Sequence, residues 1–101
     1  MDIKRNKNGS ELKVLITGRI DTNTAPTLEE EIKPNLDGIT LLILDFHKVD
    51  YISSAGLRVL LSLQKQMMQQ GEMKILGVND VVNDIFEVTG FDEILSYEKG
   101  E

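Results

Sequence analysis

Hydrophobic and polar residues alternate near the start of the chain, which is the pattern of strands that bury one face. In residues 11–18 the positions that share one face are Leu12, Val14 and Ile16. Residues 1–5 form a shorter and more polar candidate strand, and Asn8-Gly9 lies between the two segments as a turn signal. The pattern predicts an antiparallel hairpin whose first strand lies at the edge of a sheet.

A first helix is predicted after residue 24, where apolar residues take up helical spacing. The apolar stripe consists of Ala25, Leu28, Ile32 and Leu36. Candidate caps precede it in residues 21–24, and Pro26 followed by three glutamates suits a first turn. Pro34 should distort the last turn because proline lacks the backbone donor that a helix needs, and Gly38 is a stop signal.

Two further helical patterns follow. Between Ser54 and Gln70, one broad face carries Leu57, Leu60, Leu61, Met67 and Met68. Asn79 can cap a third helix, and Gly90 can end it. The residues predicted to face inward from this third helix are Val81, Val82, Ile85, Phe86 and Val88. We expect both helices to pack these faces against a sheet.

Residues 39–46 are apolar almost without interruption, which is typical of a central strand covered on both faces. Residues 73–78 and 94–97 are predicted to be two further strands. The predicted order is β-β-α-β-α-β-α-β in a single domain of residues 1–101. Because helices separate the later strands, we predict an α/β fold with a mixed, mostly parallel sheet of four to five strands and three or more helices.

The composition excludes several kinds of site and partner. The 101 residues include no cysteine and one histidine, which rules out disulfides, thiolate metal centres, a cysteine nucleophile and multi-histidine metal sites. Seventeen acidic and eleven basic residues give a net charge of -6, which disfavours nucleic acid and anionic membranes as partners. No apolar segment is long enough for a signal peptide or a membrane span, so we expect a cytoplasmic protein.

Two adjacent hydroxyl groups, those of Ser53 and Ser54, lie where the central strand leads into the second helix. Free backbone N–H groups at a helix start favour an oxygen acceptor or an anion. One interpretation is a serine that caps the helix. The other is a serine that a kinase phosphorylates, since the positive end of the helix would stabilise the added phosphate.

An enzymatic alternative is a serine hydrolase, with His47 as the only imidazole that could act as its base. The motif G-x-S-x-G is missing, because residues 52–56 read Ile-Ser-Ser-Ala-Gly, and we therefore predict no enzymatic activity. Asp21, Asp45 and Asp50 could form a carboxylate cluster at the carboxyl edge of the sheet, but turn formation and helix capping are the favoured interpretation of these residues. No phosphate-binding glycine motif is present, and we predict neither a cofactor nor a metal.

Apolar residues beside the serines favour a docking surface for another protein. The turn from Leu57 to Leu61 is expected to expose part of its apolar surface, whereas Met67 and Met68 are assigned to the core. Gly56 is a poor helix former in the first turn, which favours a partner that comes close to its backbone. The alternative is that glycine merely eases the turn into the helix.

Several segments together resemble the STAS domain family. Gly18-Arg19-Ile20-Asp21 resembles the glycine–aspartate motif before the first helix of the family, and residues 42–60 resemble its strand, phosphoserine loop and following helix. Within the family the chain is similar to bacterial anti-sigma factor antagonists. The serine that is phosphorylated in these proteins lies two residues before a glycine, which corresponds to Ser54. Ser53 stands where many members have aspartate, and it is the alternative acceptor.

The resemblance implies a binding module that is switched by phosphorylation and performs no catalysis of its own. In its unphosphorylated form it would bind an anti-sigma factor that is also a serine protein kinase, and so release a sigma factor. Phosphorylation at Ser54 would abolish binding, and a serine phosphatase would reset the switch. The implied partner-binding residues are Asp21, Thr22, Asn23, Ser53, Ser54, Gly56, Leu57 and Arg58. A STAS scaffold in another signalling complex, without phosphorylation, is the alternative function.

Overall fold

A five-stranded sheet forms the centre of the structure, a computed structural model that describes residues 1–100. Its strands, in spatial order, are β1 (Asp2–Asn8), β2 (Glu11–Ile20), β3 (Leu41–Ile52), β4 (Glu72–Val78) and β5 (Tyr97–Lys99). β1 and β2 are antiparallel, and every later pair is parallel. The helices are α1 (Ala25–Ile32), α2 (Ser54–Met68) and α3 (Asp80–Thr89), with 3-10 turns η1 (Lys33–Asn35) and η2 (Phe91–Glu93). The predicted order, mixed sheet and edge position of the first strand are confirmed.

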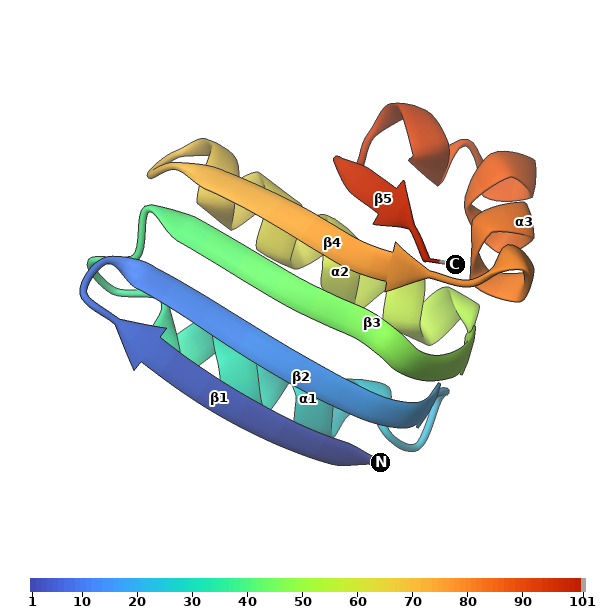
Figure 1. The fold of residues 1–101 in the computed structure, drawn as a ribbon, viewed down its shortest axis with the longest axis horizontal. Coiled ribbons are helices and arrows are strands. Elements are labelled where there is room, and N and C mark those ends of the chain that lie inside the picture. Colours follow the sequence, from blue (N-terminus) through green and yellow to red (C-terminus); the bar gives the residue numbers. More distant parts are fainter. Residues whose placement is uncertain (101) are drawn as a thin grey trace.

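The helices cover one face of the sheet and one end of it. Figure 1 shows α1 and α2 behind the sheet and α3 at the end of it, beside β4 and β5. The core lies between the sheet and α1 and α2, and the predicted stripes of β2 and α1 are buried there. On the face turned to the viewer, Leu41 and Ile43 are only half-buried and no helix covers them. The expectation that the central strand is covered on both faces is therefore wrong.

β3 continues to Ile52, well beyond the end predicted at residue 46. Along this stretch its register against β2 shifts twice, which marks β-bulges with extra residues in β3. The buried positions follow the bulges: after Phe46 they recur every third residue, at Val49 and Ile52, instead of every second. After Phe46 the sequence therefore lacks the alternation of apolar and polar residues that marks a strand, although the strand continues to the start of α2.

The end of α1 and both ends of α3 follow the predicted signals, whereas at the start of α1 the Thr24 side chain makes no capping hydrogen bond and no acidic residue lies in the first turn. α1 ends at Ile32 and is followed by η1, which contains Pro34; α3 is capped by Asn79 and ends before Gly90, which has a left-handed φ of 80°. The last strand does not follow the prediction of residues 94–97. Residues 91–93 form η2, and Ile94 continues this turn because its N–H donates to the Phe91 carbonyl at 3.0 Å. The strand therefore begins only at Tyr97.

Three residues predicted to face inward lie on the surface. The side chains of Met68, Val81 and Val88 are 72%, 52% and 88% exposed. α3 turns a different side to the core, with Val82, Asn83 and Phe86 buried. On this buried side α3 meets β5: the Tyr97 hydroxyl donates to Asn83 Oδ1 at 2.8 Å, and the Tyr97 ring meets the Phe86 ring edge-on, with centroids 4.9 Å apart.

Asn79 fastens α3 to the sheet by two hydrogen bonds. Its Oδ1 accepts from the Val82 N–H at 2.8 Å, and its Nδ2 donates to the Val49 carbonyl at 3.0 Å. We predict that Asn79→Ala lowers the free energy of unfolding by about 2 kcal/mol, since a cap and a part-buried hydrogen bond each contribute about 1 kcal/mol. Asn79→Asp keeps the cap acceptor and loses the donor, so it should cost less. Urea unfolding of both variants measures this, and equal stability of all three proteins would contradict it.

Candidate functional site

The carboxyl ends of β2, β3 and β4 meet at one edge of the sheet, where each strand leads into a helix (Figure 1). The N–H of Ser53 donates to the Ile20 carbonyl at 2.8 Å, so the loop of residues 21–24 lies beside the start of α2. This edge therefore brings together five of the residues that were predicted to bind a partner. They are Asp21, Thr22, Asn23, Ser53 and Ser54. We call these five residues the loop edge.

The two serines differ in what their hydroxyl groups do. Ser53 is the N-cap of α2: its backbone is extended, and its Oγ accepts from the Gly56 N–H at 3.4 Å. Ser54 is the first residue of the helix and is exposed, and its hydroxyl makes no hydrogen bond within residues 1–100. The capping interpretation thus applies to Ser53, and Ser54 carries the accessible hydroxyl.

Asp21 shapes the neighbouring loop. Its Oδ1 accepts from the N–H groups of Asn23 at 2.9 Å and Thr24 at 3.0 Å, and from the Thr24 hydroxyl at 3.2 Å. The Thr24 N–H lowers the pKa of Asp21 below its ordinary value of 3.8, and together with the other hydrogen bonds it outweighs the desolvation that raises this pKa. The Asp21 carboxylate is therefore ionised and engaged in hydrogen bonds within the loop, while Thr22 and Asn23 are exposed.

Gly56 and Leu57 support the loop edge from beneath. Leu57 is 5% exposed and Leu60 is buried, so the apolar surface expected on this turn is limited to the half-buried Leu61 and is absent beside the serines. A Cβ on Gly56 would lie 2.6 Å from Ile52 Cγ1 and 2.7 Å from Ile20 Cγ2. Close packing of α2 on β2 and β3 thus requires the glycine, and no partner needs to be invoked to explain it. Arg58 is exposed one turn after Ser54.

His47 pairs with a carboxylate and with neither serine. Its Nδ1 lies 2.7 Å from Asp45 Oδ1, and its ring lies against Gly77. Partial burial raises the pKa of Asp45, but the hydrogen bonds from His47 outweigh this effect and hold the pKa below its ordinary value. Within residues 1–100 no hydrogen bond joins His47 to Ser53 or Ser54, so the arrangement of a serine hydrolase is not formed.

The three aspartates considered as a cluster do not form one. In the part of the chain that the structure describes, no three His, Cys, Asp or Glu side chains converge on a position that could hold a metal ion. Asp21 and Asp45 act in local hydrogen bonds instead.

Within residues 1–100, no helix has the length and apolar character required to cross a bilayer.

A contact that the sequence pattern did not reveal lies beside the loop edge. The Arg19 guanidinium carbon is 4.6 Å from the centroid of the Tyr51 ring, a cation–π contact between the last residues of strands β2 and β3. Arg19 and Tyr51 are paired in the shifted register of the bulged strand. Only that register, which the sequence does not show, brings the two residues together.

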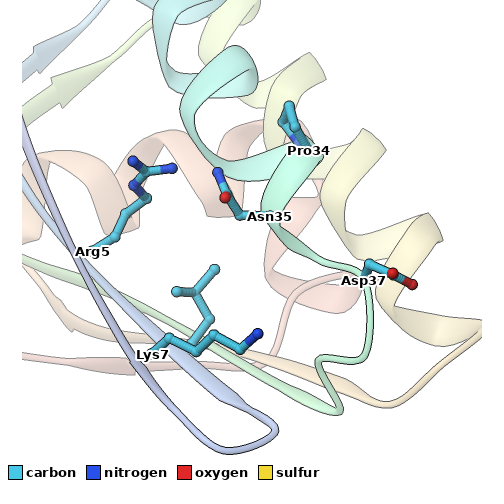
Figure 2. A pocket seen from close by; sticks show the side chains of 6 residues that line it. Arg5, Lys7, Pro34, Asn35 and Asp37 are labelled. Atoms are coloured by element: carbon cyan, nitrogen blue, oxygen red, sulfur yellow. The ribbon is translucent and has the colours of Figure 1, made fainter.

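A hollow lies at the opposite edge of the sheet (Figure 2). It is lined by Arg5, Lys7, Leu12, Pro34, Asn35 and Asp37. The Arg5 guanidinium is held by α1, because Nη1 donates to the Glu31 carbonyl at 3.0 Å and Nη2 lies 3.6 Å from Glu31 Oε2. The hollow is thus separate from the loop edge, and one of its two cations is already engaged.

Known proteins match the chain along nearly all of its length. The family model described as STAS domain matches residues 2–100. BtrV of Bordetella bronchiseptica, a protein named as an anti-sigma factor antagonist, is 37% identical over 93 residues. That match covers 90% of this chain and 80% of BtrV.

Solved structures match the fold. An anti-sigma factor antagonist from Mycobacterium paratuberculosis matches with a TM-score of 0.85 and 22% identity, over 95% of this chain and 83% of the other. SpoIIAA, a Bacillus cell fate determinant solved in its phosphorylated form, matches with a TM-score of 0.74 and 13% identity, over 97% of this chain and 92% of the other. At these identities the two structures support the fold alone.

The close packing at Gly56 has a measurable consequence. We predict that Gly56→Ala lowers the free energy of unfolding by about 1–3 kcal/mol, because the new methyl group must displace Ile20 or Ile52 in the core. Urea unfolding measures the loss. Lys65→Ala, an exposed change on the same helix, is the control and should leave stability nearly unchanged. A Gly56→Ala protein as stable as the wild type would show that the contact relaxes at no cost.

Proposed function

The chain belongs to the STAS domain family of bacterial anti-sigma factor antagonists, and we propose that it works as a phosphorylation-switched partner of an anti-sigma factor in the cytoplasm. In its unphosphorylated form it binds an anti-sigma factor that is also a serine kinase, and a sigma factor is released. Phosphorylation at Ser54 ends the binding, and a serine phosphatase restores it. The domain is the substrate and the ligand in this cycle and catalyses no reaction.

The observation that carries the proposal is that the hydroxyl groups of the two serines have different surroundings. The Ser53 hydroxyl accepts the hydrogen bond that caps α2, whereas the Ser54 hydroxyl is exposed and makes no hydrogen bond within residues 1–100. A kinase needs such a hydroxyl, because it must reach the oxygen without opening the helix. Ser54 is therefore the favoured acceptor, and Ser53 is the alternative only if the cap is given up.

A phosphate on Ser54 changes the loop edge without disturbing the fold. It adds roughly -1.5 to -2 charge at the positive end of α2, where a helix stabilises an anion. A partner surface built for a neutral hydroxyl is affected differently, because the phosphate must shed water or meet like charge to fit there. The Asp21 carboxylate already gives the loop edge a negative charge, which the phosphate increases. The switch therefore acts on the interface.

Arg58 is placed to respond to this phosphate. It lies four residues after Ser54 on the same helix, a spacing that puts two side chains side by side. It is exposed, and it forms no ion pair within residues 1–100. In the unmodified protein the guanidinium is free to contact a partner, and after phosphorylation it can pair with the phosphate. One modification would thus introduce an anion and occupy a cation on the same surface.

The acceptor is tested with the serine kinases of the source bacterium, purified and incubated with ATP and each variant. We predict that the wild type and Ser53→Ala gain one phosphate by intact mass and that Ser54→Ala gains none. Ser53→Ala should also lower the free energy of unfolding by about 1 kcal/mol, through the lost cap. Ser54→Asp should weaken binding to the kinase by at least 1–2 kcal/mol in calorimetry, as an order of magnitude for one desolvated charge. Phosphorylation of Ser54→Ala would overturn the assignment.

The role of Arg58 is tested with phosphoserine encoded genetically at position 54. The second pKa of phosphoserine is ordinarily about 6, and a neighbouring cation lowers it because it favours the dianion. We predict a value roughly half a unit higher in Arg58→Gln than in the parent protein, measured by phosphorus NMR against pH. Lys65→Gln, with the same change in charge farther along α2, is the control. Identical titration of all three proteins would exclude the pairing.

A further inference from the structure

The net negative charge of the chain is concentrated in its last part. Residues 1–79 contain ten acidic and ten basic residues, and so carry no net charge. Residues 80–101 contain seven acidic residues and one basic residue, which gives this segment the whole net charge of -6. The segment consists mainly of α3, η2 and β5, so one end of the molecule is acidic and the rest is balanced.

α3 presents three distinct faces. Its inner face is held in the core by Val82, Asn83 and Phe86. A second face carries the carboxylates of Asp80, Asp84 and Glu87. The third face is an apolar stripe, formed by Val81, Ile85 and Val88 at the spacing i, i+4, i+7. Because the two valines are 52% and 88% exposed and Ile85 is half-buried, the stripe faces solvent along the length of the helix.

The carboxylates beside the stripe are mostly left without cations. Lys99 is the only basic residue of the segment, and its Nζ lies 3.1 Å from Asp80 Oδ1. Glu87 Oε1 accepts from Asn83 Nδ2 at 2.7 Å, and within residues 1–100 no ion pair reaches Asp84. An apolar stripe bordered by uncompensated carboxylates is complementary to a surface with an apolar centre and a basic rim.

The stripe begins at the same edge of the sheet as the phosphoacceptor. α3 starts directly after β4, and the cap residue Asn79 donates to the carbonyl of Val49, in the last part of β3. Figure 1 shows the starts of α2 and α3 at the same end of the sheet. A partner that covers Ser54 therefore has the first turn of α3 within its reach.

We propose that the apolar stripe of α3 and its flanking carboxylates form a second contact surface for the same anti-sigma factor kinase, which docks there with an apolar patch bordered by Lys and Arg. The inference rests on the proposed function, because it takes that kinase as the occupant. A second copy of this chain does not fit the surface, since the contact would bring together two segments that each carry a charge of -6.

The loop edge and the α3 surface would contribute to binding in different ways. The acidic face attracts the basic partner over a distance, so it raises the association rate and is sensitive to salt. The phosphate on Ser54 acts only after contact, where it affects the fit of the loop edge. The α3 contact would remain available to the kinase in both phosphorylation states.

The experiment measures binding kinetics with the purified kinase that phosphorylates the wild-type protein. The double variant Val81→Gln/Val88→Gln should weaken binding by roughly tenfold, since two apolar side chains are lost from the interface. Asp84→Lys should slow association by roughly threefold at low salt and have less effect at high salt. Thermal melts should show all variants folded, because the three side chains are exposed.

Matched controls lie away from this face. Met68→Gln replaces another exposed apolar side chain by glutamine, at the far end of α2. Glu72→Lys makes the same change in charge as Asp84→Lys, at the amino end of β4. Both controls should bind as the wild type does. If the controls weaken binding as much as the α3 variants, the effect is one of general charge or hydrophobicity and the proposal is wrong.

The outcomes separate this inference from the proposed function. If the wild type is phosphorylated and bound, and the α3 variants bind with wild-type kinetics, the second contact does not exist and the switch at Ser54 stands. If no serine kinase phosphorylates or binds the wild type, the proposed function fails, and the α3 contact fails with it because its occupant is that kinase. Reduced binding of the α3 variants alone supports the contact.

Discussion

The structure depends most on one close contact, the packing of the first turn of α2 against the ends of β2 and β3. Ile20 and Ile52 approach Gly56 so closely that no side chain fits between them. This contact fixes the height and direction at which α2 leaves the sheet, and it therefore fixes where Ser53 and Ser54 lie. Because interiors are packed as densely as crystals, the position of the exposed hydroxyl is determined by buried atoms.

The same contact explains how the loop edge is assembled from separate parts of the sequence. Once Ile20 and Ile52 are side by side, the N–H of Ser53 can donate to the Ile20 carbonyl, and the loop that begins at Asp21 lies next to the helix start. Asp21 then orders that loop through hydrogen bonds of its own. The exposed groups at this edge, the hydroxyl of Ser54 and the side chains of Thr22 and Asn23, are carried by a rigid base, which is what a recognition surface requires.

The sequence predicted the elements of the fold well and their faces less well. Helix caps, stop signals and the hairpin turn act locally, so Asn79, Gly90 and Asn8-Gly9 could be read directly. The bulges in β3 and the rotation of α3 arise from contacts between distant segments. Tyr97 contacts Asn83 on the buried side of α3, and Val81 and Val88 face outward although their spacing looks like that of core residues. At the loop edge, the sequence marked both serines but could not assign the cap to Ser53 and exposure to Ser54, because this depends on which residue begins the helix.

If Ser54 is phosphorylated as proposed, the fold can accommodate the phosphate, and detecting it would fall to the partner. The helix start would offer positive charge to the anion, and Arg58 lies one turn away, so the proposed phosphate would need no rearrangement of the domain. Specificity of the response then lies in the interface, where the cost of burying a dianion is large. Such a switch needs binding energy from elsewhere, since a loop edge of a few small polar residues buries little apolar surface. In the proposed complex, the apolar stripe of α3, which is bordered by carboxylates and begins at the same edge, would supply that surface at a place the phosphate does not alter.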